Sequence, residues 1–357
     1  MNKKRRDIDF LKSLIKWFKT DGRKLSFRKS KDPYSIWLSE IILQQTQMET
    51  GLKYYNTFIN KFPKIKDLGE AKEEKIYNMW QGLGYYNRAK NLHKTAIIIS
   101  EKMGGVFPRN YEELLKLPGI GRYTAAAISS ICYNERKFVV DANVFRVLSR
   151  YYGINKNISN SNAYSFFEGI SKNIGENTKS VGIYNEAIMD FGGSICTPKK
   201  PHCHKCVISY SCVANRNGKQ NFFPVKNKKR IKKNLYFNYF ILENDEMFLM
   251  QKRKQKDIWL NLNEFYLLEE KNKQKAVKKF LKKIEGYNIG KLTSVPNKKK
   301  GVLTHQNIHI NFFKIFIPSK KALSSIKKKL NLNFVNKTNI NKYAVPKVID
   351  NYLKCHC

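Results

Sequence analysis

The sequence predicts a protein of two domains, an all-helical domain over residues 1–220 and a smaller α/β domain over residues 234–357. Three observations support this expectation. The chain has 357 residues, which is roughly twice the length of a common domain. Apolar residues recur at helical spacing in the first part, whereas the alternation typical of strands occurs only in the second. Residues 221–233 are basic, contain Pro224 and show no periodicity, which predicts a linker.

Helix signals define the first domain. Near the N-terminus, one helical face is formed by Ile8, Leu11, Ile15 and Phe18. Asp32 and Pro33 are typical of an N-cap and a first helical turn, and the amphipathic run that follows predicts a helix from Tyr34 to about Thr50. Asn110 is expected to cap a further helix. Strand alternation is essentially absent here, so the pattern predicts helices packed on helices.

The second domain mixes strands with a helix. Residues 236–242 and 247–251 flank Asn244 and Asp245, which predicts a β-hairpin. Gly286 is expected to end a helix. The apolar face of that helix is formed by Ala276, Val277, Phe280, Leu281 and Ile284. A further strand is predicted by the alternation of Ile308, Ile310 and Phe312.

The charge of the chain indicates the class of partner. It carries 68 Lys and Arg residues against 28 Asp and Glu residues, a formal net charge of +40. Such a charge predicts binding to a polyanion, although part of the Lys excess also fits codon drift in an AT-rich genome. No apolar run reaches the roughly 18 to 20 residues that a membrane span needs. No apolar signal segment follows the basic N-terminus, so we expect a cytosolic protein without a membrane partner.

Four cysteines lie within 17 residues and predict a metal centre. They are Cys196, Cys203, Cys206 and Cys212, separated by six, two and five residues. Structural zinc usually takes two close pairs, and only Cys203 and Cys206 form such a pair. The wider, unequal gaps favour a [4Fe-4S] cluster, with zinc as the alternative.

A tight turn at residues 117–121, with Gly119 and Gly121, separates two helical patterns, and the second pattern begins at Arg122. A glycine-rich turn at the start of a helix exposes backbone N–H groups to an anion. We therefore expect these glycines and Arg122 to contact a phosphate group. An ordinary turn between helices is the alternative.

In combination, these motifs resemble those of the helix-hairpin-helix DNA glycosylases with an iron-sulfur loop, and among them the adenine DNA glycosylase family. The resemblance covers nearly all of residues 5–320. Its further signatures are residues 37–47, residues 82–86 and residues 140–144. It implies that the chain binds duplex DNA and removes adenine paired with 8-oxoguanine or guanine, as a monomer in the bacterial cytoplasm, associated with the nucleoid.

Two positions select the monofunctional branch of that family. Endonuclease III, a bifunctional relative, has a Lys nucleophile where this chain has Tyr123, and it lacks an acid where this chain has Glu40. Two rival interpretations remain: a bifunctional glycosylase and lyase acting on oxidised pyrimidines, and an iron-sulfur DNA-binding protein without catalysis.

Two carboxylates are expected to carry the chemistry. Glu40 is flanked by apolar residues that could raise its pKa, and it would protonate the departing adenine. Asp141 would stay ionised and oppose the positive charge on the deoxyribose, or trap the sugar covalently. The resemblance implies that Tyr123 and Asn143 position these groups. The alternatives are a solvated helix acid for Glu40 and an N-cap for Asp141.

The resemblance also implies roles in base flipping and base recognition. It assigns wedge residues at Gln45 and Tyr85 and places Glu186 in the adenine pocket. The second domain resembles the Nudix-fold domain that inspects 8-oxoguanine, with Thr304 and His305 in the recognition loop. The alternatives are an exposed helix residue for Gln45, a core residue for Tyr85 and an ordinary surface acid for Glu186.

Overall fold

The computed structural model describes residues 3–176, 178–227, 231–255, 257–296, 301–302 and 306–356. Two compact units are present. The first comprises Met1–Glu70 and Asn91–Lys228, and the second comprises Ala71–Lys90 and Lys229–Cys357. The division near Lys228 falls inside the basic stretch for which the sequence predicts a linker. Each unit is described by itself below.

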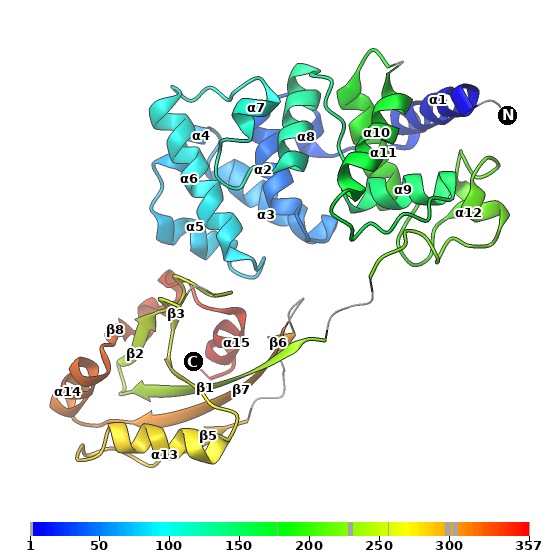
Figure 1. The fold of residues 1–357 in the computed structure, drawn as a ribbon. Coiled ribbons are helices and arrows are strands. Elements are labelled where there is room, and N and C mark those ends of the chain that lie inside the picture. Colours follow the sequence, from blue (N-terminus) through cyan, green and yellow to red (C-terminus); the bar gives the residue numbers. More distant parts are fainter. Residues whose placement is uncertain are drawn as a thin grey trace. The chain divides into compact units, whose positions relative to one another are not determined.

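The described part of the first unit consists of helices and loops, which confirms the predicted all-helical class (Figure 1). Its helices are α1 (Lys3–Asp21), η1 (Ser26–Arg28), α2 (Pro33–Leu43), α3 (Met48–Lys61), α4 (Ile65–Gly69), α6 (Tyr86–Lys102, which begins in the second unit), α7 (Tyr111–Leu114), α8 (Arg122–Tyr133), α9 (Ala142–Tyr152), α10 (Ala163–Gly175), α11 (Val181–Ser194), η2 (Cys203–Lys205) and α12 (Val213–Arg216).

Helix α11 lies at the centre of this unit, in contact with α1, α8 and α9. Two glycines allow its close approach to its neighbours. A Cβ atom at Gly182 would lie 2.6 Å from the carbonyl oxygen of Ser130 in α8, and one at Gly192 would lie 2.6 Å from the Cβ of Asn143 in α9. Larger side chains would therefore push α11 away from the helices whose first turns carry Tyr123 and Asn143.

The local helix signals are confirmed except in one place. Asp32 accepts hydrogen bonds from the backbone N–H groups of Tyr34 and Ser35, as an N-cap should. The predicted continuous helix from Tyr34 to Thr50 is wrong, because α2 ends at Leu43 and α3 begins at Met48. Gln45 between them has φ 54°, a left-handed conformation that cannot continue an α-helix.

The second unit contains a mixed sheet with the strand order β3-β2-β1-β7-β5. Strand β1 pairs antiparallel with β2, as the predicted hairpin requires, and parallel with β7. The strands are β1 (Lys233–Glu243), β2 (Met247–Lys252), β3 (Asn263–Glu264), β4 (Tyr266–Glu269), β5 (Thr293–Val295), β6 (Gly301–Val302), β7 (Gln306–Phe316) and β8 (Asn333–Asn336). The helices are α5 (Glu73–Trp80), α13 (Lys273–Lys283), α14 (Lys320–Leu330), η3 (Lys337–Lys342) and α15 (Lys347–His356).

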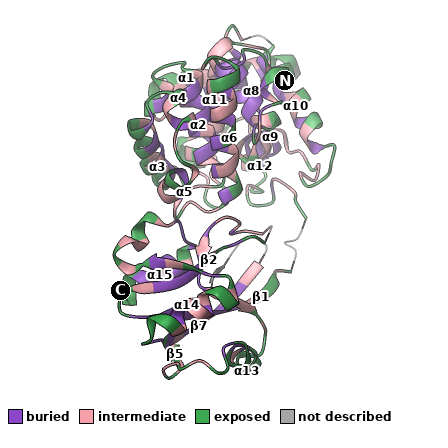
Figure 2. Cartoon of the chain, turned by 90° about the vertical axis from the view of Figure 1, so that its left-hand side faces the viewer, coloured by how far each residue is buried: buried purple, intermediate pink, exposed green. Residues whose placement is uncertain are grey.

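Helices cover both faces of this sheet. Phe280 of α13 and Ile326 of α14 belong to one buried cluster with Phe313 of β7. Because successive strand residues point to opposite faces, Phe312 lies on the other face, where its ring is 4.8 Å from that of Tyr352 in α15. Figure 2 shows buried residues along the sheet and between the helices of the first unit. The predicted α/β class of this unit is confirmed.

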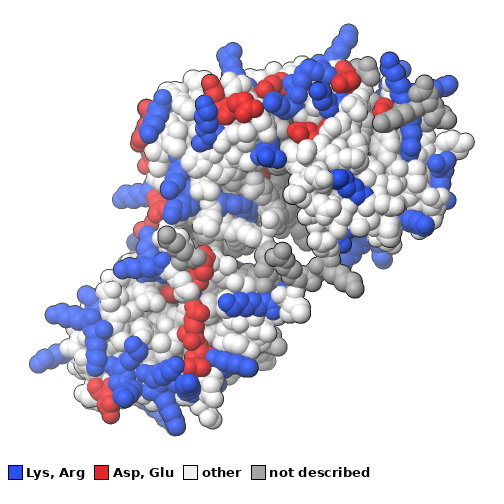
Figure 3. Space-filling model, in the orientation of Figure 1, with Lys and Arg blue, Asp and Glu red and all other residues white. Residues whose placement is uncertain are grey.

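Lys and Arg side chains are spread widely on the face of the molecule seen in Figure 3, and they gather where α13 and α14 lie. Within the described residues, none of the helices combines the length and the apolar character that crossing a bilayer would require.

Candidate active site

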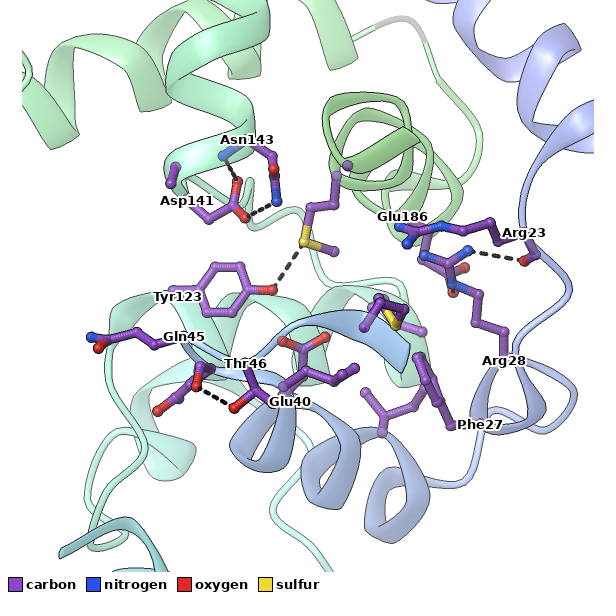
Figure 4. A pocket seen from close by; sticks show the side chains of 18 residues that line it. Arg23, Phe27, Arg28, Glu40, Gln45, Thr46, Tyr123, Asp141, Asn143 and Glu186 are labelled. Carbon is purple, nitrogen blue, oxygen red and sulfur yellow. Dashed lines mark hydrogen bonds and ion pairs between the residues drawn. The ribbon is translucent and has the colours of Figure 1, made fainter. Parts of the chain in front are cut away.

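A cavity of about 580 Å³ opens in the first unit. Its walls come from η1, α2, the segment after α2, α8, the first turn of α9, and α11, so that segments distant in sequence meet there. Six residues with an expected role line it (Figure 4): Glu40, Gln45, Tyr123, Asp141, Asn143 and Glu186. The structure therefore brings both candidate catalytic carboxylates to one cavity.

Asp141 is the N-cap of α9, and three donors fix its carboxylate. Oδ1 accepts from the backbone N–H groups of Asn143 and Val144, both at 2.8 Å, and Oδ2 accepts from Asn143 Nδ2 at 2.7 Å. Burial raises the pKa of Asp141, whereas these bonds and the charge of Arg146 act to lower it. The helix-cap and catalytic interpretations are compatible, because the capping carboxylate also lines the cavity.

Glu40 lies near the end of α2 in a different environment. Trp37, Leu38 and Ile41 beside it in sequence are buried. Burial raises the pKa of Glu40 to about 7, and the negative charges of Asp141 and Glu186 act in the same direction. The nearby hydroxyl of Tyr123, which lowers the pKa when it donates to the carboxylate, and the charge of Arg28 act against this rise. A carboxyl group with this pKa keeps its proton in a large fraction of molecules near neutral pH, as a general acid must.

Tyr123 lies in the first turn of α8, and Figure 4 shows its ring between Asp141 and Glu40. Its hydroxyl donates a hydrogen bond to the Sδ atom of Met189 at 3.0 Å. Burial, together with the charges of Glu40 and Asp141, raises the pKa of Tyr123 well above its usual value. The phenol is therefore neutral and retains its proton.

An ion cluster around the buried Asp190 lies at another wall of the cavity, and it was not expected from the sequence. Asp190 accepts from the backbone N–H of Arg23 at 2.9 Å and from its Nε at 2.5 Å. Arg28 lies between Asp190 and Glu186, 3.3 Å from each carboxylate. Burial raises the pKa of Glu186, whereas Arg28 acts to lower it. The partners are more than 150 residues apart in sequence, so local patterns give no sign of them.

Two arginines of α9 connect the cavity with the cysteine loop, and they too were missed. The Nε and Nη2 atoms of Arg146 donate to the carbonyl of Cys196 at 2.6 Å and to Asn143 Oδ1 at 2.7 Å. Because Asn143 Oδ1 is taken by Arg146, its Nδ2 faces Asp141. Arg150, one turn later, donates to the carbonyl of Thr197 at 2.7 Å. The available sequence signal was two arginines four residues apart among the apolar residues of this helix.

The glycine-rich turn has the geometry that an anion site at a helix start requires. Gly119 has φ +76°, and a Cβ atom there would lie only 2.7 Å from the Cβ of Asn91. Gly121 is the N-cap of α8, where a Cβ would meet open space, and Arg122 is exposed. Since the first N–H groups of a helix lack partners within it, this turn can present them to a phosphate.

The two expected wedge residues share an unusual backbone conformation. Gln45 and Tyr85 have φ 54° and 51°, in the left-handed region that side chains other than glycine rarely adopt. Gln45 is exposed at the cavity in the first unit. Tyr85 belongs to the second unit; it is 46% exposed, and the guanidinium of Arg88 lies 5.4 Å from its ring. The core alternative for Tyr85 is therefore wrong.

The four cysteines of the loop line a second, smaller cavity. They are free of disulfides, and Arg150 Nη1 lies 3.4 Å from Cys196 Sγ. Among the residues that the structure describes, no three His, Cys, Asp or Glu side chains are arranged so as to hold a metal ion. The four thiols that line this cavity are nevertheless of the type that ligates an iron-sulfur cluster, and Arg150 lies within hydrogen-bond distance of one of the sulfurs.

The predicted recognition residues Thr304 and His305 lie outside the described residues. The neighbouring strand is described, and there His309 stacks on Tyr236 with ring centroids 4.7 Å apart.

Comparisons with known proteins agree with these features. Residues 38–172 match the HhH-GPD superfamily of base excision DNA repair proteins, and residues 238–355 match the NUDIX domain. A protein of Buchnera aphidicola subsp. Baizongia pistaciae named adenine DNA glycosylase is 35% identical and covers 92% of each chain. One of Homo sapiens with the same name is 36% identical over 59% of this chain and 40% of its own.

Solved structures share the fold of the first unit. A thermostable thymine-DNA glycosylase has a TM-score of 0.54 at 30% identity and covers 60% of this chain and 98% of its own. Endonuclease III in a non-covalent DNA complex has a TM-score of 0.51 at 22% identity, with 61% and 99% coverage. With the near full-length similarity to the Buchnera protein, these findings show that the chain belongs to the adenine DNA glycosylase family of the HhH-GPD superfamily.

Proposed function

We propose that the protein is a base-excision repair enzyme that hydrolyses the N-glycosidic bond of adenine paired with 8-oxoguanine or guanine in duplex DNA, leaving an abasic site. The observation that carries this proposal is the pair of carboxylates in one cavity. Glu40 has a pKa of about 7, whereas Asp141 is fixed by three hydrogen-bond donors. Family membership supports adenine as the base.

The two carboxylates act in sequence. Glu40 donates its proton to a ring nitrogen of the flipped adenine while the glycosidic bond stretches. Positive charge then grows on the deoxyribose, and ionised Asp141 stabilises it. Glu40, now a carboxylate, accepts a proton from the water that attacks the sugar, which restores the starting state. Asn143 holds Asp141 in place, and Tyr123 holds Glu40.

Hydrolysis ends the reaction without cutting the strand. Strand cleavage through a Schiff base needs an amine, whereas Tyr123 offers a neutral phenol at the corresponding position. Glu186, which is paired with Arg28, can contact the adenine from the opposite wall of the cavity.

The remaining assignments concern DNA contact. We propose that Gly119, Gly121 and Arg122 bind a phosphate of the duplex, and that Gln45 and Tyr85 enter the base stack. An exposed aromatic side chain on a left-handed backbone suits such insertion. Thr304 and His305 would contact 8-oxoguanine. We also propose that the chain acts as a monomer and that its domains and linker have the limits predicted from the sequence.

The cysteine loop is proposed to hold a [4Fe-4S] cluster ligated by Cys196, Cys203, Cys206 and Cys212. When bound, such a cluster would hold the loop rigid and keep its cations Lys199, Lys200 and Lys205 directed toward a phosphate backbone, with no redox step. The proposal is supported by the cysteine spacing and by the one cavity that the four side chains line.

A single assay tests the function. The full chain is incubated with duplexes that carry adenine opposite 8-oxoguanine, guanine or thymine, and free adenine and strand breaks are measured before and after alkali. We expect adenine from the first two duplexes and strand breaks only after alkali. Breaks without alkali would support a bifunctional lyase, and no adenine from either duplex would support a protein without catalysis.

A further inference from the structure

The hydrogen bond between Tyr123 and Met189 offers the phenol a second acceptor. Tyr123 on α8 faces Glu40 on α2, and its hydroxyl donates to Met189 Sδ on α11 at 3.0 Å, the bond drawn from Tyr123 in Figure 4. All three residues line the same cavity. A phenol has one proton to donate, so donation to Met189 competes with donation to Glu40.

The choice of acceptor decides which form of Glu40 is stabilised. A hydrogen bond donated to a carboxylate favours its charged form and makes the group a poorer acid. When the phenol proton points to Met189, the lone pairs of the Tyr123 oxygen are free to accept from the protonated carboxyl of Glu40. The same hydroxyl can therefore support either protonation state.

We propose that Met189 is a positioning residue that directs the Tyr123 proton away from Glu40 until Glu40 has protonated the adenine. A thioether is a weak, neutral acceptor, whereas a carboxylate accepts a charge-assisted bond that is roughly twice as strong as a neutral one. Met189 therefore holds the phenol proton only while Glu40 is neutral. This inference rests on the proposed role of Glu40 as the general acid.

Every proton that moves in the proposed catalytic cycle is accounted for. Glu40 loses one proton to the adenine, and the hydroxyl of Tyr123 then turns from Met189 to the new carboxylate. Water gives hydroxide to the sugar and one proton to Glu40, after which the hydroxyl turns back. Tyr123 only rotates its own proton and never transfers it.

Among the described residues whose influence on Glu40 is resolved, only Tyr123 has a proton whose direction can change. Besides Tyr123, the charged groups that act on Glu40 are Asp141 at the start of α9, Arg28 of η1 and Glu186 of α11. Their influence is present whichever way the hydroxyl points. Tyr123 is influenced by Glu40, Asp141 and Arg28.

The test is Met189→Leu, which keeps an apolar side chain of similar volume and removes the acceptor. Adenine release by the full chain is measured in single turnover from pH 5.5 to 9. In the variant, we expect the midpoint of the high-pH fall in rate to lie about one pH unit lower, so that above this midpoint the rate is about tenfold below that of the wild type. At low pH the rate should change less than about twofold.

Three controls separate the outcomes. Met103→Leu makes the same chemical change at an exposed position just after the end of α6 and should leave the profile unchanged. In a Tyr123→Phe background, Met189→Leu should cause no shift, because no hydroxyl remains. Thermal unfolding checks that the variants are folded. A wild-type midpoint in Met189→Leu, or a uniform loss at every pH, would overturn the inference. If the wild-type chain releases no adenine, the proposed function fails instead.

Discussion

Replacing Arg146 with Lys would test whether α9 couples the cysteine loop to Asp141. The guanidinium donates to the Cys196 carbonyl, to the Gly192 carbonyl at 2.5 Å, to Asn143 Oδ1 and to a carbonyl of its own helix at 3.1 Å. These acceptors lie in different directions around a planar fork. A Lys ammonium is a single point and can reach one or two of them.

The size of the effect follows from the bonds that are lost. Two or three lost hydrogen bonds at about 1 kcal/mol each give a destabilisation of about 2 to 3 kcal/mol. In a unit of this size, that corresponds to a fall in the unfolding midpoint of roughly 4 to 12 °C. Asn143 also loses the partner that orients its amide, so Asp141 loses one of its three donors part of the time. We expect adenine release to slow by about 10- to 100-fold.

The assay combines thermal unfolding with single-turnover adenine release at pH 7. Arg136→Lys is the matched control, because Arg136 donates to the carbonyls of Gly175 and Glu176 away from the cavity. It should shift the midpoint by less than about 2 °C and leave the rate unchanged. An Arg146→Lys protein that equals the wild type in both measurements would refute the coupling.

Three further predictions concern the acid, the turn and the cysteine loop. Glu40→Gln should lower adenine release at least about 100-fold and raise the unfolding midpoint at pH 8. The reason is that folding raises the pKa of Glu40 from 4.5 to about 7, so that ionising this carboxyl group destabilises the wild-type protein increasingly between pH 4.5 and 7. The stability gained by Glu40→Gln should therefore shrink as the pH falls toward 4.5, and a gain that stayed constant would contradict this reasoning. Gly119→Ala should destabilise the protein to urea by about 1 to 2 kcal/mol, because its left-handed backbone and the nearby Asn91 reject a Cβ, whereas Gly121→Ala should have a much smaller effect. Cys203→Ser should reduce bound iron and visible absorbance; a colourless wild-type protein with stoichiometric zinc would rule out the cluster.

Motifs that are contiguous in sequence could be located without the structure. The Asp32 cap, the turn at residues 117–121 and the start of α8 at Arg122 all follow from short-range residue preferences. The division into a helical and an α/β part followed from periodicity. These features depend on neighbours within a few residues, which one sequence displays directly.

Features that depend on distant partners could not be predicted. The break at Gln45 occurs within an amphipathic run, because the periodicity of the side chains continues while the backbone turns. The cluster around Asp190 and the role of Arg146 join segments that only tertiary packing brings together. Glu40 and Asp141 could be chosen from motifs, but their common cavity required coordinates.

The proposed double use of Asp141, as helix cap and as catalytic charge, has a consequence for how the enzyme would decay in a lineage that no longer needs it. Asn, Ser or Thr at this position could still cap the N-terminus of α9, but none of them carries a negative charge. Folding alone would therefore tolerate these replacements, and only selection for turnover would exclude them. In reduced genomes, a change to such a residue would mark the loss of repair long before the helix itself degenerated.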